Sequence, residues 1–369
     1  MKKRGFYTLI LLYGIGVLYL ATTTPITPHE AKYFFLDRDI TSELMRFGWS
    51  IYPNFFGLRL VFILFGLLSI YLYYSFSKIY FKDNLYLSQI STLIFMLLPG
   101  ILTASVLSNI AIVVIDFVLF FLIFYYTNQR YKAIFSLLIL FFIHQSSIIF
   151  FIALFIFALN KKDKLLLISV SSFILSFIYL AQGIEISGRP SGHFMDIFAL
   201  YASLFSPFVF IYFIYIIYRI FLREEKDMIW YISSITFIVS MILSIRQKIH
   251  ITDFAPYVTI SVVLMVLIYD KTLQIRLPKF QYKYKLIYKF TLATLIISIL
   301  VILFNKFIFE QLENKKRHFA YKIYYPYTEV LKMKKDGKNC IKNIQHKYIE
   351  QYRFYGVESC KESKKQQCF

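Results

Sequence analysis

Apolar runs long enough to cross a bilayer recur through the first 309 residues, and they constrain the fold more than any other feature. A spanning helix needs about 20 mostly apolar residues. Because 58% of the 369 residues are apolar and only 17% are charged, against about a quarter in soluble domains, a water-soluble fold is excluded. Runs bounded by charged or turn residues predict eleven spans: 6–22, 55–77, 86–103, 108–127, 133–143 extended toward 147, 148–159, 165–181, 197–221, 228–244, 256–269 and 290–309.

Two of these spans are short, and the polar sequence His144-Gln145-Ser146-Ser147 separates them. We interpret them as two helices that meet in a polar turn, because one long span would place four polar side chains at mid-membrane. The loop charges agree with this interpretation. If the N-terminus is cytoplasmic, the inner segments hold 19 Lys or Arg and the outer loops hold six, as the positive-inside rule requires.

The basic start of the chain and the apolar run behind it are typical of a signal peptide, but no small-x-small cleavage site follows. We therefore keep residues 6–22 as a spanning helix. The prediction is an all-α polytopic membrane protein with a cytoplasmic N-terminus. Its transmembrane domain covers 1–309, with a first outer loop at 23–53, and an extracytoplasmic tail covers 310–369.

The predicted tail holds 14 Lys or Arg against 7 Asp or Glu, together with all three cysteines. Cysteines confined to an exported segment fit an oxidising compartment and one disulfide. We choose Cys340 and Cys360 as the pair, although chemistry alone does not select the partner; the alternative is unpaired cysteines in a loosely ordered tail. The tail carries +7 of the +20 net charge, which fits anionic head groups or an anionic acceptor and not nucleic acid.

The first outer loop carries four acids with three basic residues between them. Pro25 and Pro28 stiffen the exit from the first span, so His29 and Glu30 are expected to open a helical turn near the bilayer surface. A carboxylate held there can act as a general base toward an acceptor hydroxyl or amine. The alternative is a first-turn acid that only complements the helix dipole. Apolar and polar residues mixed over 44–52 predict a short interfacial helix.

Two later outer loops concentrate ionisable residues. The loop after 244 packs Arg246, Lys248, His250 and Asp253 into eight residues, and the loop after 181 carries Arg189. Cations beside a membrane suit a lipid phosphate, to which Arg offers a fork and Lys a point charge; the alternative is ordinary snorkelling at a helix end.

Asp116 is the one carboxylate inside a predicted span. Acids at that depth are costly and are treated first as functional. A buried, neutral or Arg-paired structural role is the alternative. No Walker, Rossmann or paired Cys-x-x-Cys signature supports nucleotide or zinc binding.

Two stretches resemble motifs of the C-type glycosyltransferases (GT-C), the polytopic group that contains protein O-mannosyltransferases and the lipid A aminoarabinose transferase. His29-Glu30-Ala31-Lys32-Tyr33 is similar to D-E-A-x-Y in the first outer loop of that group. Arg59-Leu60-Val61-Phe62-Ile63-Leu64-Phe65-Gly66-Leu67-Leu68 is similar to R-L-P-S-x-L-F-G-x-L at the start of its second span. The likeness is clearest over 1–130, where Ser108-Asn109 lies near the place of a second family acid.

Two departures accompany the resemblance. His29 replaces the first acid, which leaves Glu30 as the nearest carboxylate, and Asn109 leaves the second acidic position unfilled unless Asp116 substitutes. A histidine can still act as a base near neutral pH. The other outcome of this replacement is altered or lost activity.

The resemblance implies a periplasmic-face transferase of a bacterial inner membrane that moves a sugar from a polyprenyl-phosphate donor to a lipid, glycan or protein acceptor. Glu30 and His29 would activate the acceptor, and Arg246, Lys248 and Arg189 would hold the donor phosphate, with Arg59 in support. No cofactor is certain. Some members use a divalent metal ion, for which Glu30 and Asp37 could contribute oxygens.

Three other functions stay open on the sequence. An O-antigen polymerase or ligase depends on a large late outer loop, whereas the largest internal loop here is the first. A transporter or flippase would place charge and broken helices at membrane depth, where only Asp116 is acidic. An inactive scaffold relative would follow from the loss of the acid at His29.

Overall fold

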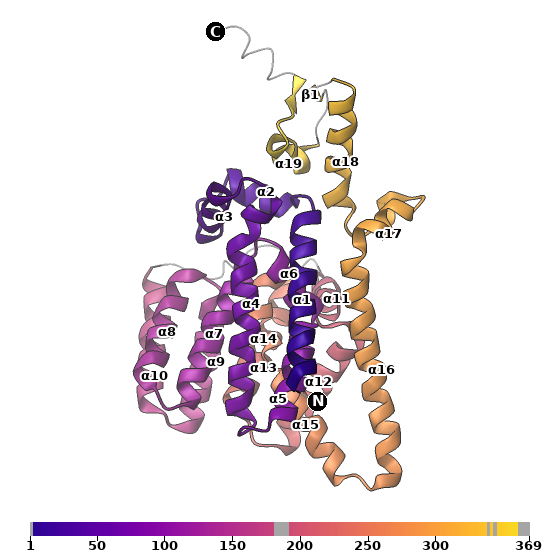
Figure 1. Cartoon of the computed structure of the whole chain (residues 1–369). Coiled ribbons are helices and arrows are strands. Elements are labelled where there is room, and N and C mark those ends of the chain that lie inside the picture. The colour runs from indigo at the N-terminus through magenta and orange to yellow at the C-terminus, as the bar shows by residue number, and fades with distance from the viewer. Residues whose placement is uncertain (1–2, 181–191, 338–339, 342–344, 361–369) are drawn as a thin grey trace. The chain divides into compact units, whose positions relative to one another are not determined.

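The computed structural model of the chain describes residues 3–180, 192–337, 340–341 and 345–360, with side chains omitted at 358–359. The described residues are helical apart from loops and one short parallel pair of strands, as predicted (Figure 1). The elements in chain order are α1 (Lys3–Thr23), α2 (Pro28–Phe35), α3 (Ile40–Ile51), α4 (Phe55–Tyr80), α5 (Leu85–Met96), α6 (Pro99–Val106), α7 (Ile110–Tyr126), α8 (Arg130–Ile143), α9 (Ser147–Lys161), α10 (Lys164–Tyr179), α11 (Phe194–Phe205), α12 (Pro207–Arg223), α13 (Met228–Arg246), η1 (Ile251–Asp253), α14 (Ala255–Thr259), α15 (Val262–Ile275), α16 (Pro278–Leu303), α17 (Asn305–Gln311), η2 (Lys315–Arg317), α18 (Tyr321–Lys335), β1 (Cys340–Ile341), η3 (His346–Tyr348), α19 (Ile349–Phe354) and β2 (Glu358–Ser359).

Long apolar helices make the chain a polytopic membrane protein. Among the described residues, five helical segments are long and apolar enough to cross a bilayer: α1, α4, α13, α14 with α15, and α16. Two bent pairs raise the number to seven, and α7, α9 and α10 are shorter apolar helices. The predicted number of eleven spans therefore stays a prediction.

The spans predicted over 86–103 and 197–221 each consist of two helices joined at a bend. The axis turns by 62° between α5 and α6 and by 105° between α11 and α12. Pro99 and Pro207 begin the second helix of each pair, because a proline cannot donate to the preceding turn. Ser206 also takes the left-handed conformation, with φ 77°. Apolar residues on both sides of each bend hid it from the hydrophobic pattern.

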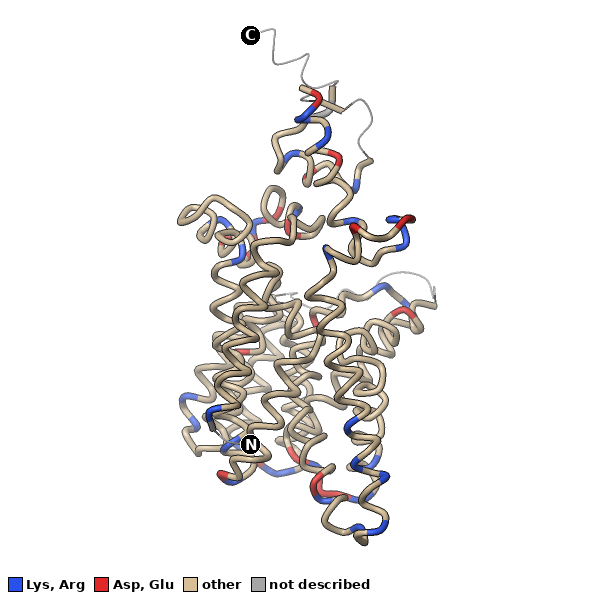
Figure 2. Tube along the Cα trace, turned by 45° about the vertical axis from the view of Figure 1, so that its right-hand side comes forward, with Lys and Arg blue, Asp and Glu red and all other residues tan. Residues whose placement is uncertain are grey.

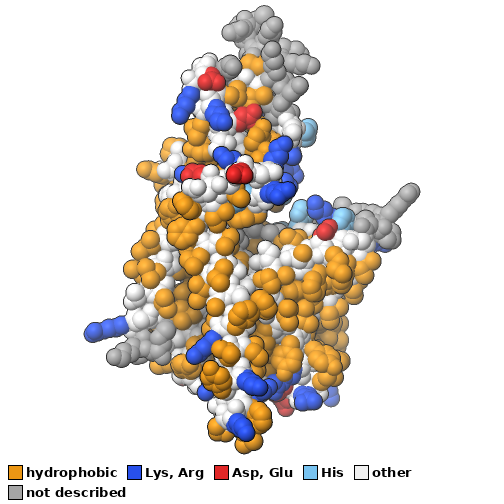
Figure 3. All heavy atoms as spheres, turned by 90° about the vertical axis from the view of Figure 1, so that its right-hand side faces the viewer, with side chains coloured by type: hydrophobic (Ala, Val, Ile, Leu, Met, Phe, Trp, Pro, Cys, Tyr) orange, Lys and Arg blue, Asp and Glu red, His pale blue; other side chains and the backbone are white. Residues whose placement is uncertain are grey.

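The predicted break near residue 144 is confirmed. Helix α8 ends at Ile143 and α9 begins at Ser147, and the Ser147 hydroxyl donates to the carbonyl oxygen of His144 over 2.6 Å. The last predicted span, 290–309, is misplaced, because α16 already begins at Pro278 and ends at Leu303. Large exposed apolar side chains gather on the second half of this helix, from Phe290 to Val301, as a surface facing lipid requires, whereas the first half also carries exposed lysines (Figure 3).

The chain divides into two compact units, and each is described here by itself. Unit 1 comprises residues 1–13, 64–105 and 109–299. Within it α7 packs against α8 and α14, and α9 packs against α10 and α13. Charged residues of unit 1 collect at the ends of its helices, whereas the middles carry few (Figure 2). This is the pattern of helices whose centres meet hydrocarbon.

Unit 2 comprises residues 14–63, 106–108 and 300–369, so it crosses the predicted boundary at 309. It contains α2 and α3 of the first outer loop together with α17, α18 and α19. The helix predicted over 44–52 exists as α3, which Asp39 caps. The tail is folded in its described part: Val330, Tyr348, Tyr352 and Val357 form a small core, and the two cysteines chosen from the sequence, Cys340 and Cys360, form a disulfide.

Candidate functional site

Helix α2 begins with a reciprocal pair of hydrogen bonds that positions Glu30. The Glu30 backbone N–H donates to Thr27 Oγ1 over 3.1 Å, and the Thr27 backbone N–H donates to Glu30 Oε2 over 2.9 Å. Pro28 occupies the first turn, where its missing N–H interrupts no helical bond. This capping box fixes the Glu30 carboxylate beneath the start of the helix.

Arg59, in the second turn of α4, forms a bidentate ion pair with Glu30. Its Nε lies 2.8 Å from Glu30 Oε1, and its Nη2 lies 2.8 Å from Oε2. The Ser108 backbone N–H also donates to Oε1, over 3.0 Å. The side chains of Arg59 and Glu30 are 0% and 2% exposed. Each carboxylate oxygen therefore accepts two hydrogen bonds away from solvent.

These bonds set the charge state of Glu30, for which the sequence predicts a catalytic role. Burial raises the pKa of the Glu30 carboxyl, but the charge of Arg59 and the bonds from Arg59, Thr27 and Ser108 outweigh burial and hold the pKa below its ordinary value of 4.5. A general base needs a lone pair within reach of the substrate proton. Both oxygens of Glu30 are engaged and buried, an arrangement typical of a structural anchor, and the catalytic role of Glu30 stays a prediction.

Arg59 uses its remaining N–H groups on backbone carbonyls. Nη1 donates to Ala21 over 3.1 Å and to Thr24 over 2.7 Å, and Nη2 donates to Pro25 over 3.0 Å. The guanidinium thus ties the end of α1 and the loop behind it to α4. Sequence reasoning gave Arg59 only a supporting role, although its place at the head of the second motif was the signal for a larger one.

The segment at the place of the second family acid has structural roles. The Ser108 hydroxyl donates to the carbonyl oxygen of Leu58 over 3.2 Å. Asn109 caps α7, because its Oδ1 accepts the Ala111 backbone N–H over 2.9 Å. Here a backbone N–H, and not a second carboxylate, meets Glu30.

His29 and Asp37 flank this pair on the first outer loop. His29 is exposed in the first turn of α2, and Asp37 is half-buried behind the end of the helix. A metal ion on Glu30 would have to displace the bonds that saturate its carboxylate, and no cluster of three or more His, Cys, Asp or Glu suited to a metal exists in the described part of the chain. Glu30 and Asp37 therefore do not fit the divalent ion considered from the resemblance.

A second polar cluster lies within unit 1, where the α8–α9 turn meets η1. His144 Nε2 lies 3.9 Å from Asp253 Oδ1, with side chains 29% and 32% exposed. The Ser146 backbone N–H donates to His144 Nδ1 over 3.2 Å. Because Nδ1 accepts this bond, the hydrogen-bond pattern assigns the proton of the neutral ring to Nε2, which faces Asp253.

Asp253 is the titratable centre of this cluster. Burial raises the pKa of its carboxyl, and the nearby His144 and His250 partly oppose that rise. The sequence placed His250 and Asp253 in one loop, but nothing in it connected them with the distant His144.

The cations predicted to hold a phosphate lie at the same end of α13 as η1. Arg246 is the last residue of α13, Lys248 follows two positions later, and both are exposed. Arg189 lies outside the described residues. Only two of the three predicted cations can therefore be placed.

Asp116 is fully buried in the middle of α7. Neither of its carboxylate oxygens has a hydrogen-bond partner among the described residues, so the Arg-paired alternative does not fit. Its surroundings offer no substrate access, and Asp116 does not join either polar cluster.

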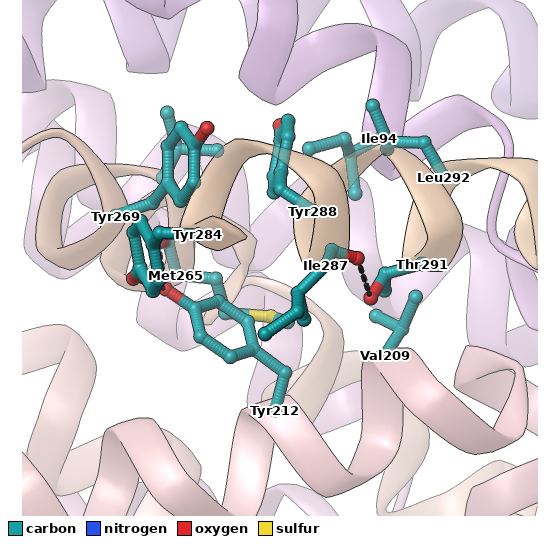
Figure 4. Close-up of a pocket in the computed structure, with 11 residues that line it drawn as sticks. Ile94, Val209, Tyr212, Met265, Tyr269, Tyr284, Ile287, Tyr288, Thr291 and Leu292 are labelled. Carbon is teal, nitrogen blue, oxygen red and sulfur yellow. Dashed lines mark hydrogen bonds between the residues drawn. The ribbon is translucent and has the colours of Figure 1, made fainter. Parts of the chain in front are cut away.

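An apolar cavity of about 50 Å³ lies within unit 1 between α12, α15 and α16 (Figure 4). Tyr269 stacks on Tyr288 with ring centres 4.0 Å apart, and the hydroxyl oxygens of Tyr212 and Tyr284 lie 3.4 Å apart. No charged side chain lines the cavity in the described structure. It lacks the acids, bases and cations that group transfer requires.

The fold is similar to that of ArnT from Cupriavidus metallidurans, a GT-C lipid A aminoarabinose transferase. The apo crystal structure matches 94% of this chain and 83% of ArnT, with TM-score 0.56 and 10% identity. The crystal structure bound to undecaprenyl phosphate matches 95% and 74%, with TM-score 0.54 and 10% identity. No protein-family model and no curated protein sequence matches the chain. The fold inferred from the motifs is thus confirmed, at an identity that shows the fold alone.

Proposed function

We propose that the chain is a membrane glycosyltransferase that moves a sugar from a polyprenyl-phosphate-linked donor to an acceptor. The observation that carries the proposal is the likeness in fold to ArnT bound to undecaprenyl phosphate. A polyprenyl phosphate is the group that such a donor releases. Because ArnT binds this lipid in a similar fold, we infer that the present chain also binds a polyprenyl phosphate and releases it after transfer.

The reaction is a displacement at the anomeric carbon. An acceptor oxygen or nitrogen forms a bond to that carbon, the bond from the carbon to the phosphate oxygen breaks, and the acceptor proton passes to a base. Cations that stabilise the departing phosphate lower the barrier. A base near neutral pKa takes up the proton.

In unit 2 we assign the base to His29, because each carboxylate oxygen of Glu30 already accepts two hydrogen bonds. The imidazole is exposed on α2 directly before the buried ion pair of Glu30 and Arg59. Glu30 and Arg59 act as positioning residues that fix the start of α2 through its capping box. A histidine in place of the family acid thereby preserves a proton acceptor at the first outer loop.

In unit 1 the donor phosphate is held by Arg246 and Lys248. Both cations are exposed at the C-terminal end of α13, a few residues before Asp253 in the sequence. An Arg fork and a Lys point charge suit the doubly charged phosphate that leaves.

The orientation follows from the loop charges. With eleven spans and a cytoplasmic N-terminus, the first outer loop, the loop after α13 and residues 310–369 all face the periplasm of a bacterial inner membrane. The polyprenyl-phosphate donor and the acceptor would meet the protein on that side. Reporter fusions after residues 130 and 310 test this topology, with an inside signal expected at the first and an outside signal at the second.

A transporter or flippase of the same lipid is the second candidate. The observation that favours it is the pair of broken spans, α5 with α6 and α11 with α12, because transporters use discontinuous helices at their substrate sites. The two functions differ in chemistry: a transporter leaves the donor intact, whereas a transferase releases polyprenyl phosphate.

Release of polyprenyl phosphate by the purified protein tests the proposal. Wild type is expected to convert a polyprenyl-phosphate sugar in the presence of an envelope extract as acceptor. His29→Ala should lower kcat by about 10²-fold or more, which is the usual contribution of a general base. The matched control is His346→Ala, which replaces an exposed histidine of the C-terminal part. Unchanged kcat in His29→Ala would remove the assigned base, and no release with any donor would favour the transporter.

A further inference from the structure

Helix α19 in the C-terminal part of unit 2 holds the loop that builds the Glu30 and Arg59 site. Gln351 Nε2 donates to the carbonyl oxygen of Ile26 over 2.8 Å and to that of Lys322 over 3.2 Å. The Ile26 backbone N–H donates to the Tyr355 hydroxyl oxygen over 3.3 Å. Gln351 is 1% exposed. Both backbone polar groups of Ile26 are thus bonded to side chains more than 300 residues away in the sequence.

Ile26 is the centre of the segment whose backbone surrounds Arg59. The carbonyls of Thr24 and Pro25 accept from Arg59, and the N–H of Thr27 donates to Glu30. If Ile26 moved, these neighbours would move with it, because a trans peptide leaves only two soft dihedrals per residue. The bonds from α19 therefore fix the backbone that the ion pair requires.

Aromatic contacts press α19 onto the same part of unit 2. The Phe354 ring centre lies 5.8 Å from that of Phe34 and 5.2 Å from that of Trp49. It stacks on Phe55 at 6.2 Å. These partners belong to α2, α3 and the start of α4. Such pairs stabilise a contact beyond the area they bury.

The Cys340–Cys360 disulfide closes the segment that contains α19. Only four buried residues form the core beneath this segment, and small folded segments of that kind generally depend on a covalent link. Helix α19 itself has six residues, too few to be stable alone. The disulfide is therefore a covalent constraint on the segment that carries Gln351 and Tyr355.

We propose that Gln351 and Tyr355 are positioning residues of the transferase site, and that closure of the Cys340–Cys360 disulfide is what assembles them on the first outer loop. Oxidation removes two protons and two electrons from the two thiols and passes them to a disulfide-bearing oxidant by thiol–disulfide exchange, which leaves that oxidant as a dithiol. A chain still in a reducing compartment has an open site. The activity part of this inference rests on the proposed function.

Hydrogen exchange at the first outer loop tests the inference without requiring activity. The purified full chain is compared with Gln351→Glu, which keeps the side-chain size but deletes the donor, with Tyr355→Phe, and with Cys340→Ser/Cys360→Ser. Exchange of the amides within residues 26–31 should rise by about tenfold or more in the glutamate and serine variants, the loss of a buried hydrogen bond. In Tyr355→Phe the rise should be confined to the Ile26 amide, which loses its acceptor. Lys334→Ala and Cys368→Ser are the controls and should match wild type.

Release of polyprenyl phosphate supplies the second readout. In the two variants with faster exchange, kcat should fall at least fivefold while KM for the donor changes less than twofold, and incubation of wild type with a dithiol should reproduce the serine double variant. Wild-type exchange at residues 26–31 in Gln351→Glu and in the double variant would overturn the inference. If wild type releases no polyprenyl phosphate while exchange changes as expected, the proposed function is overturned. The positioning of the first outer loop by Gln351 and Tyr355 is then still supported.

Discussion

The two polar clusters differ in how completely their hydrogen-bonding capacity is used. In unit 2 the Glu30 carboxylate accepts four bonds from Arg59, Thr27 and Ser108, and solvent does not reach it. In unit 1 the Asp253 carboxylate faces His144 over 3.9 Å, and about a third of each side chain is exposed. The first carboxylate has no capacity left for a substrate, whereas the second has.

This difference separates the residues that build the fold from those that can serve chemistry. A buried ion pair whose partners are all satisfied is costly to disturb, because removing one member leaves an uncompensated charge. A half-exposed cluster tolerates substitution but can exchange protons with solvent and ligands. A place in a sequence motif does not tell whether a residue builds the fold or serves chemistry. Glu30 lies in the first motif, and its carboxylate is fully hydrogen-bonded and buried.

Removal of Arg59 should have the largest effect on stability. Arg59→Met should lower the free energy of unfolding by about 3–5 kcal/mol, because Glu30 would stay buried without its partner. Thermal unfolding in detergent measures the loss. Lys271→Met, which breaks the surface pair of Lys271 with Glu224, is the control and should cost less than about 1 kcal/mol. Equal losses in the two variants would contradict the buried network.

Substitution of Gly57 should have the next largest effect. An added Cβ would lie 1.7 Å from the Tyr52 carbonyl oxygen, where the end of α3 meets the start of α4. Gly57→Ala should therefore cost about 1–3 kcal/mol by overpacking. Gly16→Ala is the matched control, because its nearest neighbour is a flexible Leu303 methyl at 3.2 Å. A wild-type melting temperature in Gly57→Ala would show that this contact is absent.

The ionised Glu30 carboxylate should make the free energy of unfolding fall moderately at acid pH. Because the pKa of Glu30 is held below its ordinary 4.5, the folded state binds fewer protons than the unfolded state in that range. Its stabilising contribution is present above pH 4.5 and is lost as pH falls through the lowered pKa. Unfolding followed from pH 7 to pH 3 should show a smaller acid loss in Glu30→Gln than in wild type. An identical acid loss in both proteins would exclude Glu30 as the cause.

The unit 1 cluster should show the smallest effect on stability. His144→Asn and Asp253→Asn should each change the free energy of unfolding by less than about 1 kcal/mol, because both side chains are partly exposed. A stability loss as large as that of Arg59→Met would place this cluster among the structural networks.

The sequence predicted the membrane class, the break after Ile143, helix α3 and the residues of the first motif, because each depends on local pattern. Bends at Pro99 and Pro207 were missed, since apolar residues flank both. The saturation of Glu30 was also missed, because it depends on the Ser108 amide from a remote segment. The partners of Ile26 in α19 and the approach of His144 to Asp253 likewise exist only in three dimensions.

Binding of undecaprenyl phosphate to the purified protein tests the central claim most directly. Native mass spectrometry in detergent should detect a bound phosphate lipid at micromolar concentration, and Arg246→Gln/Lys248→Gln should weaken it about tenfold or more, the loss of charge-assisted bonds. Undecaprenol, which lacks the phosphate, should bind no better to wild type than to the variant. Equal binding of the phosphate and the alcohol by wild type would contradict the account.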